Sequence, residues 1–131
     1  MSDWLQVAAA LALAFALWRL FRMLRPGIAP EVAAREAAAG TAVVIDVREP
    51  DEWAAGAAAP ARLLPLSDLR GGRREWGPFL AENRERRLLL YCAAGGRSGL
   101  AASILRREGF AAENLGSFHR WRAAGLPVRR P

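Results

Sequence analysis

Hydrophobic residues are grouped in blocks along this chain of 131 residues, and the length of each block predicts its structure. The longest block, residues 4–24, is interrupted by one glutamine and two arginines. It has close to the roughly 20 residues that a helix needs to cross a bilayer. The shorter blocks at residues 42–47 and 88–92 have the length of buried strands. The pattern therefore predicts one long apolar helix followed by an α/β domain.

Prolines, glycines and the spacing of apolar residues predict the remaining elements. We expect helices over residues 31–39, 51–55, 78–85, 98–108 and 118–124, strands over 42–47, 63–64, 88–92 and 111–115, and irregular chain over 56–60 and 67–77. Helices that alternate with strands favour a mainly parallel sheet covered on both faces, with its site at the carboxyl ends of the strands. The predicted fold class is a three-layer α/β/α domain with a small, mainly parallel sheet, preceded by one transmembrane helix.

The predicted organisation has three parts. Residues 1–25 form a transmembrane anchor, residues 26–30 form a linker whose two prolines break the helix, and residues 31–131 form the domain. Two alternatives are a cleaved signal peptide and a helix buried in a soluble core. The second is weakened because residues 31–131 are enough for a complete small domain without the helix.

The charges beside the apolar block predict its orientation. Arg19, Arg22 and Arg25 lie at its carboxyl end, whereas Asp3 precedes it. A signal peptide carries its positive charge before the apolar stretch, so this arrangement favours an anchor. The positive-inside rule then places the domain in the cytoplasm, as part of a single-pass membrane protein held by residues 4–24.

Composition excludes some classes of function. The net charge is +6, but 53% of the residues are hydrophobic, and no basic run is interleaved with aromatic residues as a nucleic-acid surface requires. We therefore expect no nucleic-acid partner. One cysteine cannot form an internal disulfide, and the only histidine, His119, has no second ligand near it in the sequence. We expect neither a metal nor another cofactor.

The chemistry is predicted to lie at the cysteine. Cys92 ends an apolar strand and is followed by a loop of small residues, an arginine and a serine: Ala93, Ala94, Gly95, Gly96, Arg97 and Ser98. Small residues leave backbone N–H groups free to turn inward, and the following helix adds the partial positive charge of its N-terminus. With Arg97 this environment favours a thiolate. We expect Ser98 to cap the helix. Most lone cysteines fill a core, but a core cysteine needs no cationic loop.

Three segments in a characteristic order resemble a known family. They are Asp46-Val47-Arg48-Glu49 with Glu52-Trp53 and Gly56, then the loop of residues 91–98, and finally Gly116-Ser117, Trp121 and residues 124–128. Together they resemble the single-domain rhodanese family of sulfurtransferases. Three positions depart from that family's usual pattern: Ala57 replaces a histidine, Ala93 replaces a frequent arginine, and Ser117 replaces a frequent glycine.

The resemblance implies a sulfurtransferase of the thiosulfate:cyanide type. Cys92 would take sulfane sulfur from a small anionic donor such as thiosulfate and pass it to a thiol or cyanide. The backbone N–H groups of residues 93–98 would hold the persulfide, and Arg97 would bind the donor's oxygens. Asp46 and Arg48 are interpreted as a structural charge pair that fixes the neighbouring loop.

Two other functions stay open. Phosphatases of related fold place five residues between cysteine and arginine, whereas this loop has four, which disfavours phosphate esters. A catalytically weak, membrane-tethered binding or sulfur-carrier module is the second alternative. Such modules commonly lack the cysteine, which this chain retains.

Overall fold

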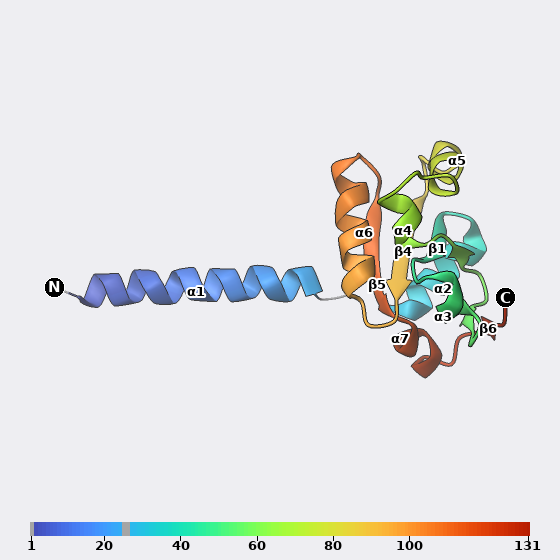
Figure 1. Ribbon diagram of the computed structural model, residues 1–131. Helices are drawn as coiled ribbons and strands as arrows, with labels where there is room; N and C mark the ends of the chain where they lie inside the picture. Colours follow the sequence, from blue (N-terminus) through green and yellow to red (C-terminus); the bar gives the residue numbers. More distant parts are fainter. Residues whose placement is uncertain (1, 25–26) are drawn as a thin grey trace.

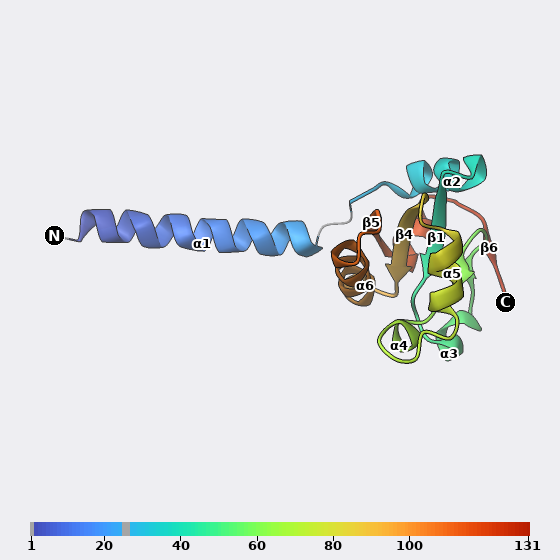
Figure 2. The same cartoon turned by 90° about the horizontal axis from the view of Figure 1, so that it is seen from above.

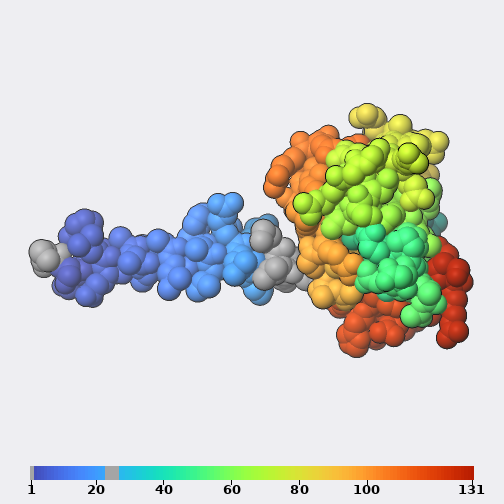
Figure 3. Space-filling view, in the orientation of Figure 1, coloured from blue at the N-terminus to red at the C-terminus, as the bar shows by residue number. Residues whose placement is uncertain are grey.

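A long helix projects from the rest of the molecule in the computed structural model, which describes residues 2–24 and 27–131. This helix, α1 (Asp3–Leu24), extends from the domain as a straight rod (Figures 1 and 3). The segment Asp3–Arg22 has a mean hydropathy of 1.7, and none of it is buried in the structure. The predicted apolar helix is therefore present and has the length and composition of a membrane span, which signal sequences share. Arg25 and Pro26, with which we ended the anchor and began the linker, lie outside the described residues.

Four strands in the described part of the chain form a sheet in the order β3-β1-β4-β5. The central strands are β1 (Ala42–Asp46) and β4 (Arg87–Cys92), flanked by β3 (Arg62–Leu63) and β5 (Ala112–Ser117). All three pairings are parallel. The two apolar blocks form the central strands. Helices cover both faces of a parallel sheet, so the side chains of its central strands are buried on both sides and are mostly apolar.

Helices cover both faces of the sheet (Figure 2). α2 (Pro30–Ala39) and α7 (Phe118–Ala123) pack on one face. α4 (Leu66–Leu69), α5 (Trp76–Glu82) and α6 (Gly96–Arg107) pack on the other. The short helix α3 (Pro50–Trp53) follows the end of β1. The predicted three-layer α/β/α architecture is confirmed.

Alternate residues of the central strands divide between the two cores, as the period of a strand requires. In β4, Leu88, Leu90 and Cys92 belong to the core beneath α6, whereas Leu89 and Tyr91 belong to the core beneath α2 and α7. Cys92 therefore lies on the α6 side of the sheet.

The expectation of irregular chain over residues 67–77 was wrong at both ends, because α4 extends to Leu69 and α5 begins at Trp76. Asp68 explains why α5 begins at Trp76. Its carboxylate accepts hydrogen bonds from the backbone N–H groups of Arg74, Glu75 and Trp76, at 2.9, 3.0 and 2.9 Å. A carboxylate that satisfies these free N–H groups acts as a helix cap from outside the helix and lets α5 begin at Trp76 rather than Pro78.

The loop predicted over residues 56–60 contains a strand, β2 (Ala57–Ala58). It pairs antiparallel with β6 (Val128–Arg129), which the sequence did not predict. Ala57, at the position where the rhodanese family usually has histidine, is completely buried in this pair. Two-residue strands carry too little periodicity to be recognised from local pattern.

The described part of the predicted linker packs against the domain. The N–H of Gly27 donates to the carbonyl oxygen of Asn114 in β5 at 2.9 Å. Ile28 joins the core beneath α2, and Pro30 is the first residue of that helix. The chain thus reaches the domain beside β5, at the edge of the sheet.

Candidate active site

The loop predicted to carry the chemistry lies where the central strands end. Cys92 is the last residue of β4, and α6 begins four residues later at Gly96. Its neighbour Tyr91 is in register with Asp46, the last residue of β1. The structure thus brings Cys92 and the Asp46-Val47-Arg48 segment to one end of the sheet, as expected for a parallel α/β fold.

The Cys92 sulfur receives hydrogen bonds from its own loop. The backbone N–H of Gly95 lies 3.0 Å from Sγ, and the backbone N–H and the hydroxyl of Ser98 each lie 3.4 Å from it. Burial raises the pKa of the Cys92 thiol, because the residue is 1% exposed, but these hydrogen bonds and that of the Ala94 N–H lower the pKa further than burial raises it. The net effect stabilises the thiolate, the form that reacts as a nucleophile.

Gly95 makes this arrangement possible. Its φ of 100° lies in the region that side-chain-bearing residues rarely adopt, and the residue forms the N-cap of α6. The loop also packs against β5: a Cβ on Gly95 would lie 3.6 Å from the Cα of Gly116. The left-handed conformation directs the N–H of Gly95 back to the sulfur.

The expectation that Ser98 caps α6 was wrong. The helix begins two residues before the predicted start at Ser98, with Gly95 in the cap position, so Ser98 lies inside the first turn. Its fully buried hydroxyl is 2.8 Å from Oδ1 of Asn114 and bonds no N–H of the helix. Gly95, a glycine in the left-handed conformation, occupies the cap position where we expected a serine side chain.

Asn114 is a site residue that the sequence reasoning missed. Its Oδ1 accepts from the Ser98 hydroxyl and, at 2.9 Å, from the N–H of Gly116, while its Nδ2 donates to the carbonyl oxygen of Gly95 at 3.0 Å. A signal was present in the sequence. Asparagine is disfavoured in strands, and a polar side chain in a buried strand needs hydrogen-bond partners.

The Arg97 guanidinium is held by a carboxylate. Its Nη1 and Nη2 lie 2.5 and 2.8 Å from the two carboxylate oxygens of Glu52 in α3. This pair lowers the pKa of Glu52 to about 2, with Arg97 the largest cause. Arg97 stays about one-third exposed. An anion that binds Arg97 therefore shares the guanidinium with Glu52.

The predicted charge pair between Asp46 and Arg48 is present and buried. Arg48 Nη2 lies 2.7 Å from Asp46 Oδ2, with side chains 7% and 0% exposed. Arg48 also donates to the carbonyl oxygens of Gly56 at 2.7 Å and Glu52 at 3.3 Å. The pair thus fixes the loop between β1 and β2, and with it the carboxylate that holds Arg97.

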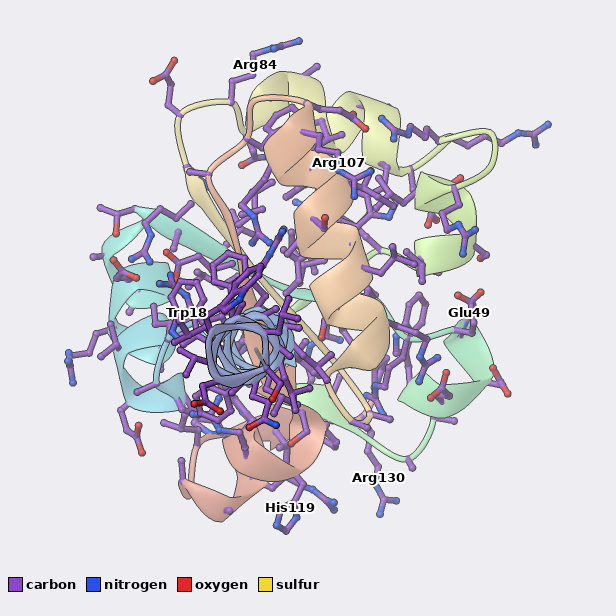
Figure 4. All side chains as sticks on the ribbon, turned by 90° about the vertical axis from the view of Figure 1, so that its left-hand side faces the viewer. Trp18, Glu49, Arg84, Arg107, His119 and Arg130 are labelled. Carbon is purple, nitrogen blue, oxygen red and sulfur yellow. The ribbon has the colours of Figure 1, made fainter. Side chains whose placement is uncertain are left out.

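His119 lies on α7 at the edge of the domain with its side chain directed outward (Figure 4). Phe118 and Trp121 of the same helix are buried in the core. Among residues 2–24 and 27–131, no group of three or more His, Cys, Asp or Glu side chains is placed to hold a metal ion.

Fold and site together define a class: three-layer α/β domains in which a strand ends at a cysteine and the following loop and helix cradle its sulfur. The family of rhodanese-like domains matches residues 29–124. The chain belongs to this family.

Individual relatives are distant. An uncharacterised Bacillus subtilis protein, YqhL, is 39% identical over 82 residues, which cover 61% of this chain and 60% of that protein. A rhodanese-related protein from Thermoplasma volcanium superimposes with a TM-score of 0.67 at 27% identity, covering 82% of this chain and all of its own. A human single-domain sulfurtransferase superimposes with a TM-score of 0.62 at 26% identity, covering 76% and 96%. The chain thus spans 60% of the length of the curated relative that it matches.

Proposed function

We propose that this protein is a sulfurtransferase that carries sulfane sulfur as a persulfide on Cys92. The observation that carries the proposal is the set of N–H donors of Gly95 and Ser98 around the buried Cys92 sulfur in a rhodanese-family domain. Such donors stabilise a thiolate before the reaction and a terminal persulfide anion after it. The human relative described as a single-domain sulfurtransferase supports the same assignment.

The first half-reaction loads sulfur onto the enzyme. The Cys92 thiolate attacks the outer sulfur of thiosulfate or a similar donor and forms a new S–S bond. The donor's own S–S bond breaks, and sulfite leaves with its electron pair. The product is a persulfide whose terminal sulfur carries the negative charge.

The second half-reaction transfers this sulfur to a thiophilic acceptor. Cyanide, or the thiolate of an acceptor thiol, attacks the terminal sulfur and forms a bond to it while the Cys92–sulfur bond breaks. Thiocyanate or an acceptor persulfide leaves, and the Cys92 thiolate is regenerated. The two half-reactions balance without a cofactor.

The decisive experiment is the intact mass of the full-length protein after treatment with thiosulfate. We expect the addition of one sulfur atom, removed by dithiothreitol. Absence of sulfur uptake would favour the alternative of a membrane-tethered binding module. Hydrolysis of an aryl phosphate by a Cys92-dependent route would favour a phosphatase.

Arg97→Ala is expected to impair loading far more than release. The oxygens of thiosulfate need the guanidinium, whereas the persulfide rests on backbone N–H groups. A lost charge-assisted hydrogen bond costs about 1.5–3 kcal/mol, so kcat/KM for thiosulfate should fall roughly ten- to a hundredfold or more. Arg97→Lys should recover part of the loss, because it keeps the charge without the planar fork. The measurement is a separate stopped assay of each half-reaction at two ionic strengths.

Arg107→Ala is the matched control, because it removes the same charge from the far end of α6, where Arg107 contacts Ser103. It should leave both half-reactions unchanged. Equal losses in the two half-reactions of Arg97→Ala would mean that Arg97 maintains the shape of the loop. Unchanged donor kinetics would shift the anion-binding role elsewhere, with Arg48 as the first residue to test.

We also propose that α1 anchors the domain to a membrane with the active site in the cytoplasm. The apolar segment of α1 is unburied, and Arg19 and Arg22 lie near its carboxyl end, on the side of the domain. We expect the full-length chain to resist carbonate extraction and the domain to resist protease added to spheroplasts. Recovery in the soluble fraction would contradict the anchor. Loss of residues 2–24 from the mature mass would identify a signal sequence, and external cleavage would reverse the orientation.

A further inference from the structure

Asn114 holds several site groups at once, although it does not touch the Cys92 sulfur. It is 7% exposed and lies in β5, next to the active-site loop. Leu90 of β4 is opposite Asn114, but Tyr91 is opposite Gly116, so β5 contains one extra residue directly after Asn114. Such a bulge changes the direction of neighbouring side chains and is frequent beside active sites.

The orientation of the Asn114 amide follows from its neighbours. The N–H of Gly116 lies 2.9 Å from Oδ1 and requires an acceptor there. The carbonyl oxygen of Gly95 lies 3.0 Å from Nδ2 and requires a donor. A flipped amide would oppose donor to donor and acceptor to acceptor, so this arrangement satisfies both ends.

The Ser98 hydroxyl has one proton and four acceptors near it. Asn114 Oδ1 lies at 2.8 Å, the carbonyl oxygen of Gly95 at 3.2 Å, and both Cys92 Sγ and the carbonyl oxygen of Gly116 at 3.4 Å. The shortest contact is with Asn114 Oδ1, which makes this oxygen the best-placed acceptor of the proton while the sulfur is neutral. When the sulfur becomes anionic, the same proton has a stronger acceptor within reach.

We propose that Asn114 is a positioning residue of the Cys92 site. Its Nδ2 holds the carbonyl group of Gly95, and with it the residue whose N–H faces the sulfur. Its Oδ1 holds the Ser98 hydroxyl ready to turn to an anionic sulfur. The inference rests on the proposed function only in regarding Cys92 as the sulfur carrier. The hydrogen-bond arrangement itself is independent of which reaction the thiolate performs.

The test is the pH profile of Cys92 alkylation by iodoacetamide in the full-length protein, which reports the thiolate directly. Asn114→Asp places a carboxylate beside the loop and opposes it to the carbonyl oxygen of Gly95. We expect the midpoint to rise by about one pH unit, a tenfold loss of thiolate below the midpoint. Asn114→Ala should raise the midpoint less, because the loop loosens without an added charge.

Other charged groups near the sulfur stay constant in this comparison. They are Arg97 in the first turn of α6, Glu52 paired with it, and the buried Asp46–Arg48 pair beside the end of β1. Asn83 supplies the matched control, since it is also 7% exposed and its Nδ2 donates to the carbonyl oxygen of Phe79 in α5. Asn83→Asp should leave the midpoint unchanged.

Folded Asn114 variants whose midpoint stays at the wild-type value, or falls, would overturn the proposal. Should both variants unfold, the unsubstituted protein decides: the side-chain amide resonances of Asn114 should titrate with the midpoint of Cys92, and resonances that do not move would overturn it. A shifted midpoint without sulfur uptake would refute the sulfurtransferase and leave the role of Asn114 standing. Sulfur uptake together with an unshifted midpoint would support the sulfurtransferase and overturn the role of Asn114.

Discussion

Cys92→Ser should abolish sulfur loading and transfer while leaving the fold intact. A serine hydroxyl is not ionised at neutral pH and forms no persulfide, whereas the N–H donors of Gly95 and Ser98 that face Sγ also suit an oxygen. Loss of a nucleophile that acts together with its surroundings costs several orders of magnitude, so we expect at least a roughly thousandfold loss. The measurement is intact mass after thiosulfate together with thiocyanate formation from cyanide.

Ser103→Ala is the control. It is a substitution of similar size at a position in α6 away from the Cys92 sulfur. It should keep activity and thermal stability near those of the wild type. Cys92→Ala provides a second variant that lacks any nucleophilic atom. Residual transfer in both Cys92 variants would place the sulfur on another group, and the proposed mechanism would then be abandoned.

The sequence predicted those parts of the fold and site whose information is local. Residues 42–47, apolar except for Asp46, and residues 88–92 are runs too short for anything but strands in this context, and both became central strands. Asp46 and Arg48 are two residues apart, so their pairing was visible in the sequence. The same holds for the loop after Cys92, whose small residues and helix lie in a single segment.

Contacts between distant segments were not predictable from local pattern. Arg97 and Glu52 are 45 residues apart, and Asn114 is 16 residues from Ser98. Each pairing depends on how the parallel strands bring their ends together, which periodicity does not report. The loop around Cys92 was therefore predicted without Glu52, the carboxylate that binds its arginine, and without Asn114, the amide that holds it in place.

The second large expected effect is on the free energy of unfolding of the domain. Asp46→Ala is expected to destabilise the domain by about 3–5 kcal/mol, because removal of one partner leaves a buried charge without compensation. Arg48 is enclosed by the rings of Tyr91 and Phe118, with its guanidinium carbon 5.9 and 4.7 Å from their centroids. These rings attract a cation but do not replace a carboxylate with three hydrogen bonds from the Arg48 side chain.

The chain contains a control in an exposed arginine–carboxylate pair, Arg73 and Glu108. Arg73 and Glu108 are joined by two hydrogen bonds, at 2.6 and 2.8 Å, but their side chains are 34% and 36% exposed. Exposed pairs contribute at most about 1 kcal/mol, because solvent screens them and the ions lose little hydration. Denaturant unfolding followed by tryptophan fluorescence, with Trp76 and Trp121 buried as probes, should therefore show a large decrease in midpoint for Asp46→Ala and a small one for Glu108→Gln. Similar decreases for the two variants would mean that solvent reaches Arg48 when Asp46 is lost, and the Asp46–Arg48 pair would then not be what fixes the loop beside the active site.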